Sequence, residues 1–384
     1  MPEPSIADAV VSGLSAGRIP RVFGHPQAPV TALVDALDAT GGDPEFVPAR
    51  TPESAALMAA GHARRTGDPG VCLAAGGTCA GGLLAGLDAA RRAHLPVLAV
   101  VAEPGPVPGG EVGVTTRLLA EVCHDVRFAT DPVRVPQAMD EALRAASRGG
   151  GPVGLVLPYR PADGRARVGS PGFAARLVLD ELSTRLPPTA TVVVDGTLRL
   201  AHPPGAPGEV AVVGPAGLPG GALPYAVAVK LAAPDRPVVA LVADDGMRAQ
   251  GLAELVTVAR RRPAWPDPRL VVLVCNSRSG HPRHLDPARS VTDDVPYAGW
   301  ARLLGLHGVR VDRPELVGAA WDEALNADRP SVLEVLTDAL SHRSGGTICD
   351  LAASPPPEPS PMVLTGGGPT MAGWPFLSGT DKIP

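Results

Sequence analysis

The stretch PVVALVADDGMRAQGLAEL, residues 237–255, carries the pattern that decides the fold. A Val-rich run that is apolar on both faces ends in two acids and a glycine, and a helical pattern begins soon afterwards. Strands without a polar face are typical of parallel sheets that helices cover on both sides. The stretch therefore predicts a buried strand with Asp244 and Asp245 at its carboxyl end.

Short apolar runs alternate with longer amphipathic runs along most of the chain. In the first half they predict strands at 21–23, 71–75, 97–102 and 153–157, and helices at 29–39, 52–65, 81–93 and 136–147. In the second half they predict strands at 192–194, 210–213, 238–243, 270–275 and 332–336, and helices at 173–186, 223–233, 252–261, 297–304 and 314–326. This alternation predicts an α/β protein with two doubly wound parallel sheets.

Two stretches without the alternation divide the chain. Residues 159–172 are rich in turn-forming residues, and the sequence from about Ser344 onward is rich in Pro, Gly and Ser without periodicity. We therefore expect an α/β domain over 1–160, a linker over 161–188, a second α/β domain over 189–343 and an irregular tail over 344–384.

Composition narrows the class of protein. Hydrophobic residues make up 45% of the chain but aromatic residues only 3%, so the cores must consist of Ala, Val and Leu. The net charge of −5, with both signs spread along the chain, gives no reason to expect nucleic acid or an anionic membrane as a partner. The five cysteines contain no CxxC pair, which argues against a disulfide framework or zinc site. Neither a signal peptide nor a membrane-spanning run is evident, so we expect a cytoplasmic protein.

Polar residues follow two of the predicted strands in the second half. Asp245 comes just after the strand at 238–243, and Asn276 follows the strand at 270–275. Ligands of open parallel sheets bind at the carboxyl ends of the strands, and carboxylate and amide oxygens suit Mg²⁺. An Asp and an Asn on adjacent strand ends can face one octahedral ion. The alternative is that Asp244 and Asp245 only end a strand and cap a helix.

The order of these features resembles the cofactor motif of thiamine diphosphate enzymes. This part of the chain has, in order, a strand, an Asp-Gly pair, a helix that carries Glu254-Leu255 and a strand followed by Asn. The branch of the family that resembles it most is that of acetolactate synthases and 2-oxo acid decarboxylases. The resemblance implies that Asp245, Asn276 and the carbonyl of Arg278 bind Mg²⁺. It also implies that the following residues bind the cofactor: Gly77, Leu218, Pro219, Gly220, Asp244, Gly246, Met247 and Gly280.

The segment GLPGGALPYAVAVKLA, residues 217–232, resembles the glycine-rich turn and helix of the same family. The resemblance implies that Leu218 or Pro219 bends the cofactor into its V shape, and the sequence does not separate the two. Two positions depart from the family pattern: Asp244 replaces a Gly and Cys275 replaces an Asn. A carboxylate close to a diphosphate is unfavourable unless it turns away or a metal ion neutralises it.

The segment ARTPESAALMAAGHARRTG, residues 49–67, resembles the first domain of the family, and the match continues through 70–102 and 150–158. It implies that Glu53 is the carboxyl group that bonds to the aminopyrimidine ring of the cofactor, in an apolar site that keeps a proton available. It also implies a homodimer or homotetramer, because this domain of one subunit faces the metal-binding domain of another. The alternative role of Glu53 is that of an acid stabilised in the first turn of a helix.

The predicted pocket contains few acid–base groups. His25 and Gln27 in FGHPQA, residues 23–28, and His281 after the metal loop are candidates for substrate contacts, and ordinary loop roles are an equal alternative. Family members that release aldehydes often carry paired histidines, which the matched loops of the first domain lack. This favours decarboxylation of a 2-oxo acid with carboligation. A simple decarboxylase of the phosphonopyruvate or sulfopyruvate type is the alternative. The middle domain that holds FAD in some branches is missing, so FAD is not expected.

Two readings from other classes stay open. A degenerate, non-catalytic partner subunit is favoured by Asp244 and by Gly77-Thr78-Cys79, which stands where the family has Gly-Pro-Gly. A nicotinamide enzyme is suggested by GPAGLPG, residues 214–220, but this run is GxxGxxG rather than GxGxxG. It also leaves the pair Asp245 and Asn276 and the segment around Glu53 unexplained.

Overall fold

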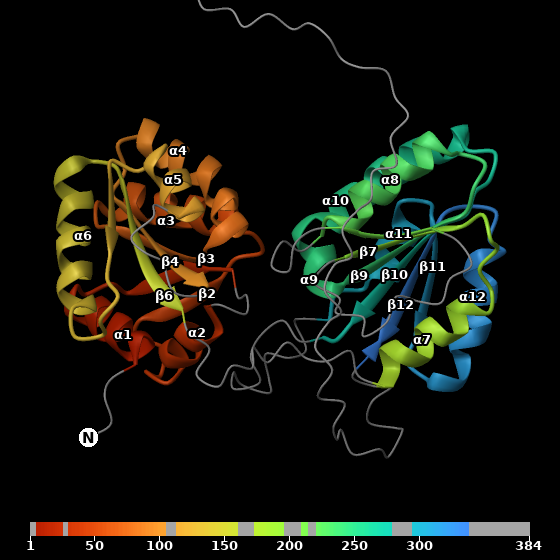
Figure 1. Cartoon of the computed structure of the whole chain (residues 1–384), viewed down its shortest axis with the longest axis horizontal. Helices are drawn as coiled ribbons and strands as arrows, with labels where there is room; N and C mark the ends of the chain where they lie inside the picture. The colour runs from red at the N-terminus through yellow and green to blue at the C-terminus, as the bar shows by residue number, and fades with distance from the viewer. Residues whose placement is uncertain are drawn as a thin grey trace, which may run out of the picture. The chain divides into compact units, whose positions relative to one another are not determined.

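The computed structural model describes residues 5–25, 30–104, 113–159, 173–195, 209–213, 220–278 and 294–337. These residues form two six-stranded sheets in which every pair of neighbouring strands is parallel, with helices on both faces of each sheet (Figure 1). The α/β class predicted from the alternation is therefore confirmed. The predicted tail over 344–384 lies outside the described residues.

The first sheet has the strand order β2-β1-β3-β4-β6-β5. Its strands are β1 (Arg21–Gly24), β2 (Glu45–Pro48), β3 (Gly70–Ala75), β4 (Val97–Pro104), β5 (Asp125–Phe128) and β6 (Pro152–Tyr159). One face packs against α1 (Ile6–Ala16), α2 (Thr31–Asp38) and α6 (Val135–Gly149). The other face packs against α3 (Pro52–Thr66), α4 (Leu84–Arg92) and α5 (Val114–Ala120).

Small residues allow close packing in this domain without aromatic side chains. Helix α3 buries five alanines, and a Cβ on Gly86 of α4 would lie 2.6 Å from the Cβ of Ala56. A Cβ on Gly70 would collide with the backbone of Ala59, so β3 approaches α3 closely as well. The sequence predicts a single helix over 81–93, but residues Gly77–Leu83 form a 3₁₀ helix and α4 begins only at Leu84.

The second sheet has the strand order β11-β12-β10-β9-β7-β8. Its strands are β7 (Thr191–Asp195), β8 (Glu209–Val213), β9 (Val238–Ala243), β10 (Leu270–Asn276), β11 (His307–Val311) and β12 (Ser331–Leu336). One face packs against α7 (Phe173–Ser183) and α12 (Val317–Leu325), and the other against α8 (Ala222–Ala232), α10 (Leu252–Arg261) and α11 (Tyr297–Leu303). Helix α7 lies within residues 161–188, the predicted linker. It packs on the second domain, where the Trp321 side chain of α12 donates a hydrogen bond to the Val178 carbonyl of α7.

Each sheet reverses its strand order at one place that bears on function. In the first sheet, β1 is flanked by β2 and β3, and in the second sheet β7 is flanked by β8 and β9. In open α/β sheets, ligands bind at the carboxyl ends of strands beside such a reversal. His25 follows β1, Gly77 follows β3, Asp195 ends β7, and Asp244 follows β9. The topology alone therefore marks these strand ends as candidate sites.

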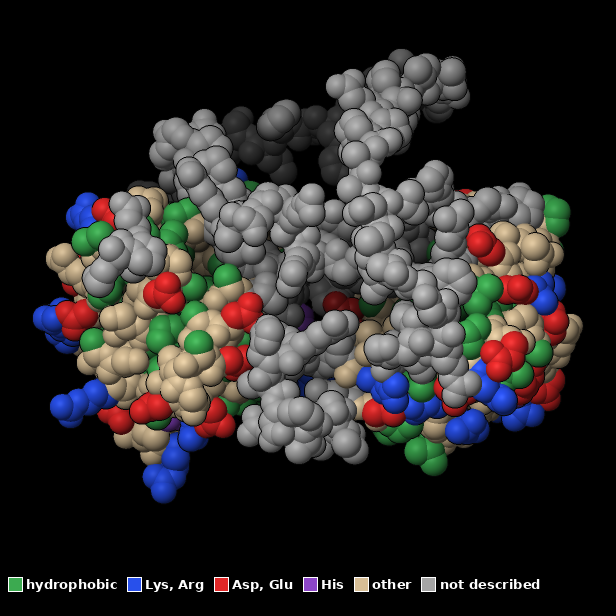
Figure 2. All heavy atoms as spheres, turned by 90° about the horizontal axis from the view of Figure 1, so that it is seen from below, with side chains coloured by type: hydrophobic (Ala, Val, Ile, Leu, Met, Phe, Trp, Pro, Cys, Tyr) green, Lys and Arg blue, Asp and Glu red, His purple; other side chains and the backbone are tan. Residues whose placement is uncertain are grey.

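On the face shown in Figure 2, acidic and basic side chains are interspersed over the described parts of the chain. Among the helices formed by the described residues, none is long and apolar enough to cross a membrane.

Candidate functional site

The carboxyl end of β9 runs directly into a helix. Residues Asp244–Gly246 form the first turn (α9), Met247–Gly251 form a π-helical turn, and α10 continues from Leu252. The Asp244 carboxylate accepts the backbone N–H of Asp245 at 2.9 Å, and the Asp245 carboxylate accepts that of Gly246 at 2.8 Å. Both acids therefore interact with the start of the helix, as the capping alternative expects.

The environment of Asp245 favours a positive charge. Desolvation of the carboxylate, together with the neighbouring carboxylates of Asp244 and Asp195, raises the pKa of Asp245 to about 6. Asp195, at the end of β7, is fully buried. A divalent cation beside Asp245 would relieve this repulsion, because an opposite charge stabilises the ionised form of a carboxyl group.

Asp244 turns toward protein partners. Its Oδ2 accepts hydrogen bonds from Arg248 Nη2 at 2.7 Å and from Ser277 Oγ at 3.0 Å. Tyr297, a fully buried residue of α11, donates from its hydroxyl to the Asp244 carbonyl at 3.0 Å and accepts from Arg248 Nε at 3.1 Å. Burial raises the pKa of Tyr297 to about 12, so this phenol keeps its proton and serves as a donor.

Asn276 ends β10 and is fully buried. Its Nδ2 donates to Glu334 Oε1 at 2.8 Å, and its Oδ1 accepts the backbone N–H of Arg278 at 3.0 Å. Glu334 of β12 is also fully buried, and its other oxygen accepts the Ala298 N–H at 3.0 Å. These bonds fix the direction of the Asn276 amide. Arg278 has a left-handed backbone with φ of 52°.

Two glycines allow the turn before α8 to approach the end of β9. Gly220, with φ of 95°, donates its N–H to Asp195 Oδ2 at 2.7 Å, and a Cβ there would lie 2.8 Å from the Gly246 carbonyl oxygen. A Cβ on Gly246 would lie 2.9 Å from Asp195 Oδ2. Position 220 therefore requires glycine, and position 246 leaves little room for a side chain. Leu218 and Pro219 of the same turn lie outside the described residues, as do Gly280 and His281.

In the first domain, Glu53 is in the first turn of α3. Thr51 caps this helix by accepting the Ser54 N–H, Pro52 occupies the first helical position, and the Glu53 side chain is exposed. This domain by itself therefore does not form the apolar surroundings that the resemblance implies for Glu53.

The turn after β3 is built around Gly77, whose φ is 66°. Its N–H donates to the Thr115 hydroxyl at 2.7 Å, and this hydroxyl in turn donates to the carboxylate of Glu103 at the end of β4. The adjacent Gly76 passes so close to Glu103 that a Cβ would collide with it. The altered Gly-Thr-Cys turn is thus an ordered turn held by α5 and β4.

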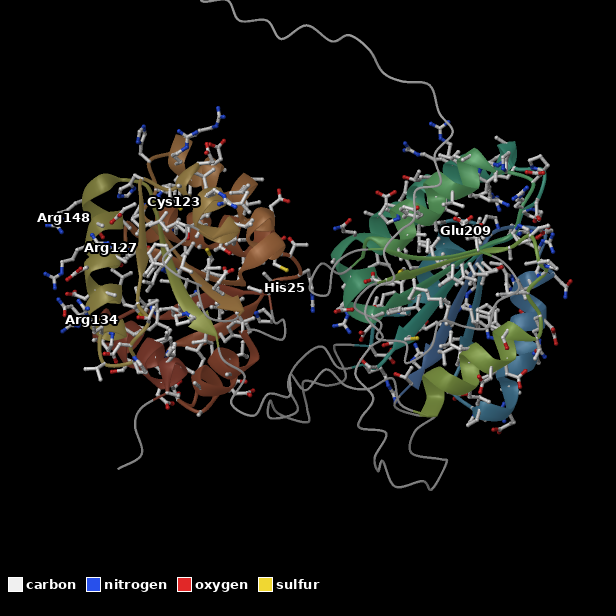
Figure 3. The ribbon with its side chains drawn as sticks, in the orientation of Figure 1. His25, Cys123, Arg127, Arg134, Arg148 and Glu209 are labelled. Atoms are coloured by element: carbon white, nitrogen blue, oxygen red, sulfur yellow. The ribbon has the colours of Figure 1, made fainter. Side chains whose placement is uncertain are left out.

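His25 lies just beyond the end of β1, and in Figure 3 it is at the side of this domain opposite Arg127, Arg134 and Arg148. The ring is buried, and its Nδ1 hydrogen bonds to the Ala49 carbonyl at 3.2 Å. Burial lowers the pKa of His25, only partly opposed by this hydrogen bond, and nearby Arg50 lowers it further. The ring is therefore neutral at pH 7. Gln27, the other predicted substrate residue of this turn, lies outside the described residues.

The structure brings the predicted residues of the second sheet onto adjacent strand ends. Asp245 follows β9 and Asn276 ends β10. These two strands pair in register up to Ala243 and Cys275, and the Asp244–Ser277 hydrogen bond links their ends. Sequence reasoning missed the buried Asp195, Arg248, Tyr297 and Glu334. An acid inside an otherwise apolar strand, as in SVLEVL of β12, is a signal that can identify Glu334.

The donor set fits a magnesium ion that also binds a phosphate-containing group. No three His, Cys, Asp or Glu side chains gather as a metal site among the described residues. A set of one carboxylate, one amide oxygen and one backbone carbonyl leaves coordination positions open, and Mg²⁺ commonly fills such positions with phosphate oxygens and water. The raised pKa of Asp245 and the start of a helix at Asp244 both favour this arrangement.

Comparison with protein families yields two matches. Residues 4–106 match the N-terminal thiamine pyrophosphate-binding domain of thiamine pyrophosphate enzymes, and residues 199–335 match the C-terminal thiamine pyrophosphate-binding domain of the same enzymes. Together these matches cover more than half of the chain. The first includes β1 to β4, and the second extends from β8 into β12.

Curated relatives agree with the family match. An uncharacterised 42.6 kDa protein of Pseudomonas amyloderamosa is 29% identical over 41% of this chain and 41% of its own length. Pyruvate oxidase of Lactiplantibacillus plantarum is 30% identical over 36% of this chain and 24% of its own length. The large subunit of acetolactate synthase isozyme 2 of Escherichia coli is 31% identical over 46% of this chain and 34% of its own length. The match thus spans less than half the length of each of these relatives.

Proposed function

Because this chain belongs to the family of thiamine pyrophosphate enzymes, we propose that it binds thiamine diphosphate with Mg²⁺, decarboxylates a 2-oxo acid and transfers the resulting acyl group to a second carbonyl compound. The observation that carries this proposal is the carboxylate of Asp245, which follows β9, has a raised pKa and lies on the strand end adjacent to that of Asn276. The acetolactate synthases among the relatives support the carboligation.

Each residue has a separate task in this proposal. Asp245, Asn276 and the carbonyl of Arg278 hold Mg²⁺, while Gly220, Gly246 and Met247 line the diphosphate. Thiamine diphosphate, when bound, supplies the chemistry that stabilises an acyl anion. Glu53 holds a proton at its carboxyl oxygen for the aminopyrimidine ring. Because Glu53 is exposed in a single chain, we propose that a second copy covers it in a homodimer or homotetramer.

Carboligation is favoured over simple decarboxylation by the state of His25. Protonation of the product needs an acid, and the buried His25 is neutral because its pKa is lowered. A neutral imidazole is a poor proton donor at pH 7. Product analysis with a 2-oxo acid such as pyruvate distinguishes the two: carboligation gives a hydroxy-oxo acid, and simple decarboxylation gives an aldehyde.

The test of cofactor binding is thermal unfolding of the full chain. Thiamine diphosphate plus Mg²⁺ should raise the melting temperature, since a ligand at 100 times its Kd stabilises by about 2.7 kcal/mol. Asp245→Asn and Asn276→Ala should each abolish the rise, while Glu53→Gln should keep it and lose turnover. Absence of any rise in the unmodified chain would overturn the proposal and favour a degenerate partner subunit. Full turnover in Glu53→Gln would remove Glu53 from its role.

A further inference from the structure

Asp244 adds a negative charge to the metal motif, at a position where the resemblance to the family implies a Gly. Its side chain is 11% exposed and that of its partner Arg248 is 8% exposed, so the two form a nearly buried ion pair. One carboxylate oxygen accepts from Arg248 and Ser277, and the other accepts the Asp245 N–H. Both oxygens are therefore engaged by groups of the protein.

Hydrogen bonds to Asp244 and to Tyr297 hold the Arg248 side chain in place. It follows Asp244 by four residues, one turn along the continuous helix that begins at Asp244. Its Nη2 donates to the Asp244 carboxylate and its Nε donates to the Tyr297 hydroxyl. Because Tyr297 also donates to the Asp244 carbonyl, the guanidinium lies within a closed ring of hydrogen bonds. A buried carboxylate with such a partner carries its own neutralising charge.

The same carboxylate joins the two strand ends that hold the proposed metal ligands. Asp244 directly precedes Asp245, and Ser277 directly follows Asn276. The backbone ladder between β9 and β10 ends at Ala243 and Cys275, and the Asp244–Ser277 bond continues the connection through side chains. A shift of one strand end against the other would break this bond.

We propose that Asp244, Arg248 and Ser277 form a clasp that positions Asp245 and Asn276 for Mg²⁺, so that the acid at this position supports cofactor binding. The inference rests on the proposed function. It assigns positioning roles to three residues, and Arg248 acts through Asp244 and Tyr297. Groups that orient metal ligands commonly change metal affinity by about 10- to 100-fold when they are removed.

The clasp and simple charge repulsion predict opposite changes in Mg²⁺ affinity when Asp244 is replaced. If Asp244 opposed the diphosphate, replacing it with the family's residue in Asp244→Gly would tighten Mg²⁺ binding. The clasp instead predicts Mg²⁺ binding that is weaker by about 10-fold or more, as for other orienting groups. Arg248→Met should weaken binding more than the double variant Asp244→Gly with Arg248→Met, because only the single variant leaves a buried carboxylate unpaired.

The experiment measures the Kd for Mg²⁺ at saturating thiamine diphosphate by the change in Trp fluorescence of the full chain. It also records the melting temperature without cofactor. Ser277→Ala tests the link between the strand ends with a small change and should weaken Mg²⁺ binding by a few-fold. The matched control is Asp267→Asn, which breaks another Asp–Arg pair, with Arg269, before the start of β10. It should lower the melting temperature and leave the Kd unchanged.

The outcomes separate the clasp from the proposed function. If the unmodified chain shows no Mg²⁺-dependent signal with thiamine diphosphate, both fail. If it binds, but Asp244→Gly and Ser277→Ala bind as tightly or more tightly, only the clasp is overturned. Weaker binding in Asp267→Asn would also overturn it, because the effect would then follow from lost stability.

Discussion

The side-chain amide of Asn276 donates a 2.8 Å hydrogen bond to the carboxylate of Glu334, and neither side chain is exposed. Glu334 distinguishes the two ends of the amide, because a carboxylate accepts hydrogen bonds and thus attracts the nitrogen. Arg310 approaches the same carboxylate at 3.4 Å and pairs with Asp294 at 2.6 Å, so the buried charge is partly compensated. The amide oxygen of Asn276 is thereby kept toward the loop that carries Arg278.

We predict that Glu334→Gln weakens Mg²⁺ binding by about 10-fold. Glu334 accepts from Asn276 and from the Ala298 N–H on separate oxygens, whereas a glutamine has only one oxygen. Titration calorimetry with Mg²⁺ at saturating thiamine diphosphate measures the loss. Glu323→Gln, which affects an exposed pair with His307, is the control. An unchanged Kd in Glu334→Gln would show that Asn276 does not depend on this bond.

Gly220→Ala should destabilise the fold and weaken thiamine diphosphate binding. The new methyl group would lie 2.8 Å from the Gly246 carbonyl oxygen, and φ of 95° is unfavourable for any residue with a Cβ. We expect a loss of about 1–3 kcal/mol in the free energy of unfolding. The control is Gly61→Ala inside α3, where a Cβ meets nothing within 4 Å and alanine should stabilise by about 0.5–1 kcal/mol. Urea unfolding measures the free energy of unfolding of both variants. An equal change in the two variants would contradict the close approach of Gly220 to the Gly246 carbonyl oxygen.

The described cysteines should be unreactive in the folded protein. Burial raises the pKa of Cys123 and of Cys275 to about 12, and that of Cys72 still higher, while Cys79 shifts in the same direction. The thiolate is the reactive form, so these four thiols, none of which is in a disulfide, should resist iodoacetamide at pH 7.5 and react after denaturation. Peptide mass spectrometry measures the labelling at each position. Rapid native labelling of Cys72 would contradict its burial.

The fold could be predicted wherever the strands are buried on both faces. Strands such as β9 and β10 have unbroken apolar runs, because helices cover both sides of the sheet. The strands that sequence reasoning missed, β2, β5 and β11, lie at the edges of the two sheets and are partly exposed. An edge strand contacts only one neighbour and needs no apolar run, so its sequence resembles that of a loop.

The site could be predicted only where a short motif spans one strand and its following turn. Asp245 and Asn276 each follow a predicted strand, and their neighbourhood follows from parallel topology. The partners that orient them are distant in sequence: Glu334 lies 58 residues after Asn276, and Tyr297 lies 53 residues after Asp244. The sequence alone gives no register between β10 and β12, so these contacts follow only from three-dimensional packing.

The titration of His25 should contribute to the pH dependence of the protein's stability. Burial lowers its pKa in the folded protein below the value of about 6.5 for an unfolded chain. Near pH 6 the unfolded chain therefore binds more protons, and stability that is fully present above pH 6.5 is lost as pH falls through the folded pKa. His25→Asn keeps a donor for the Ala49 carbonyl but cannot titrate. Between pH 7 and 5 the melting temperature of the unmodified chain should fall more steeply than that of His25→Asn, whereas above pH 7.5 their difference should stay constant. Parallel curves across the whole range would show that His25 is not buried as the structure has it.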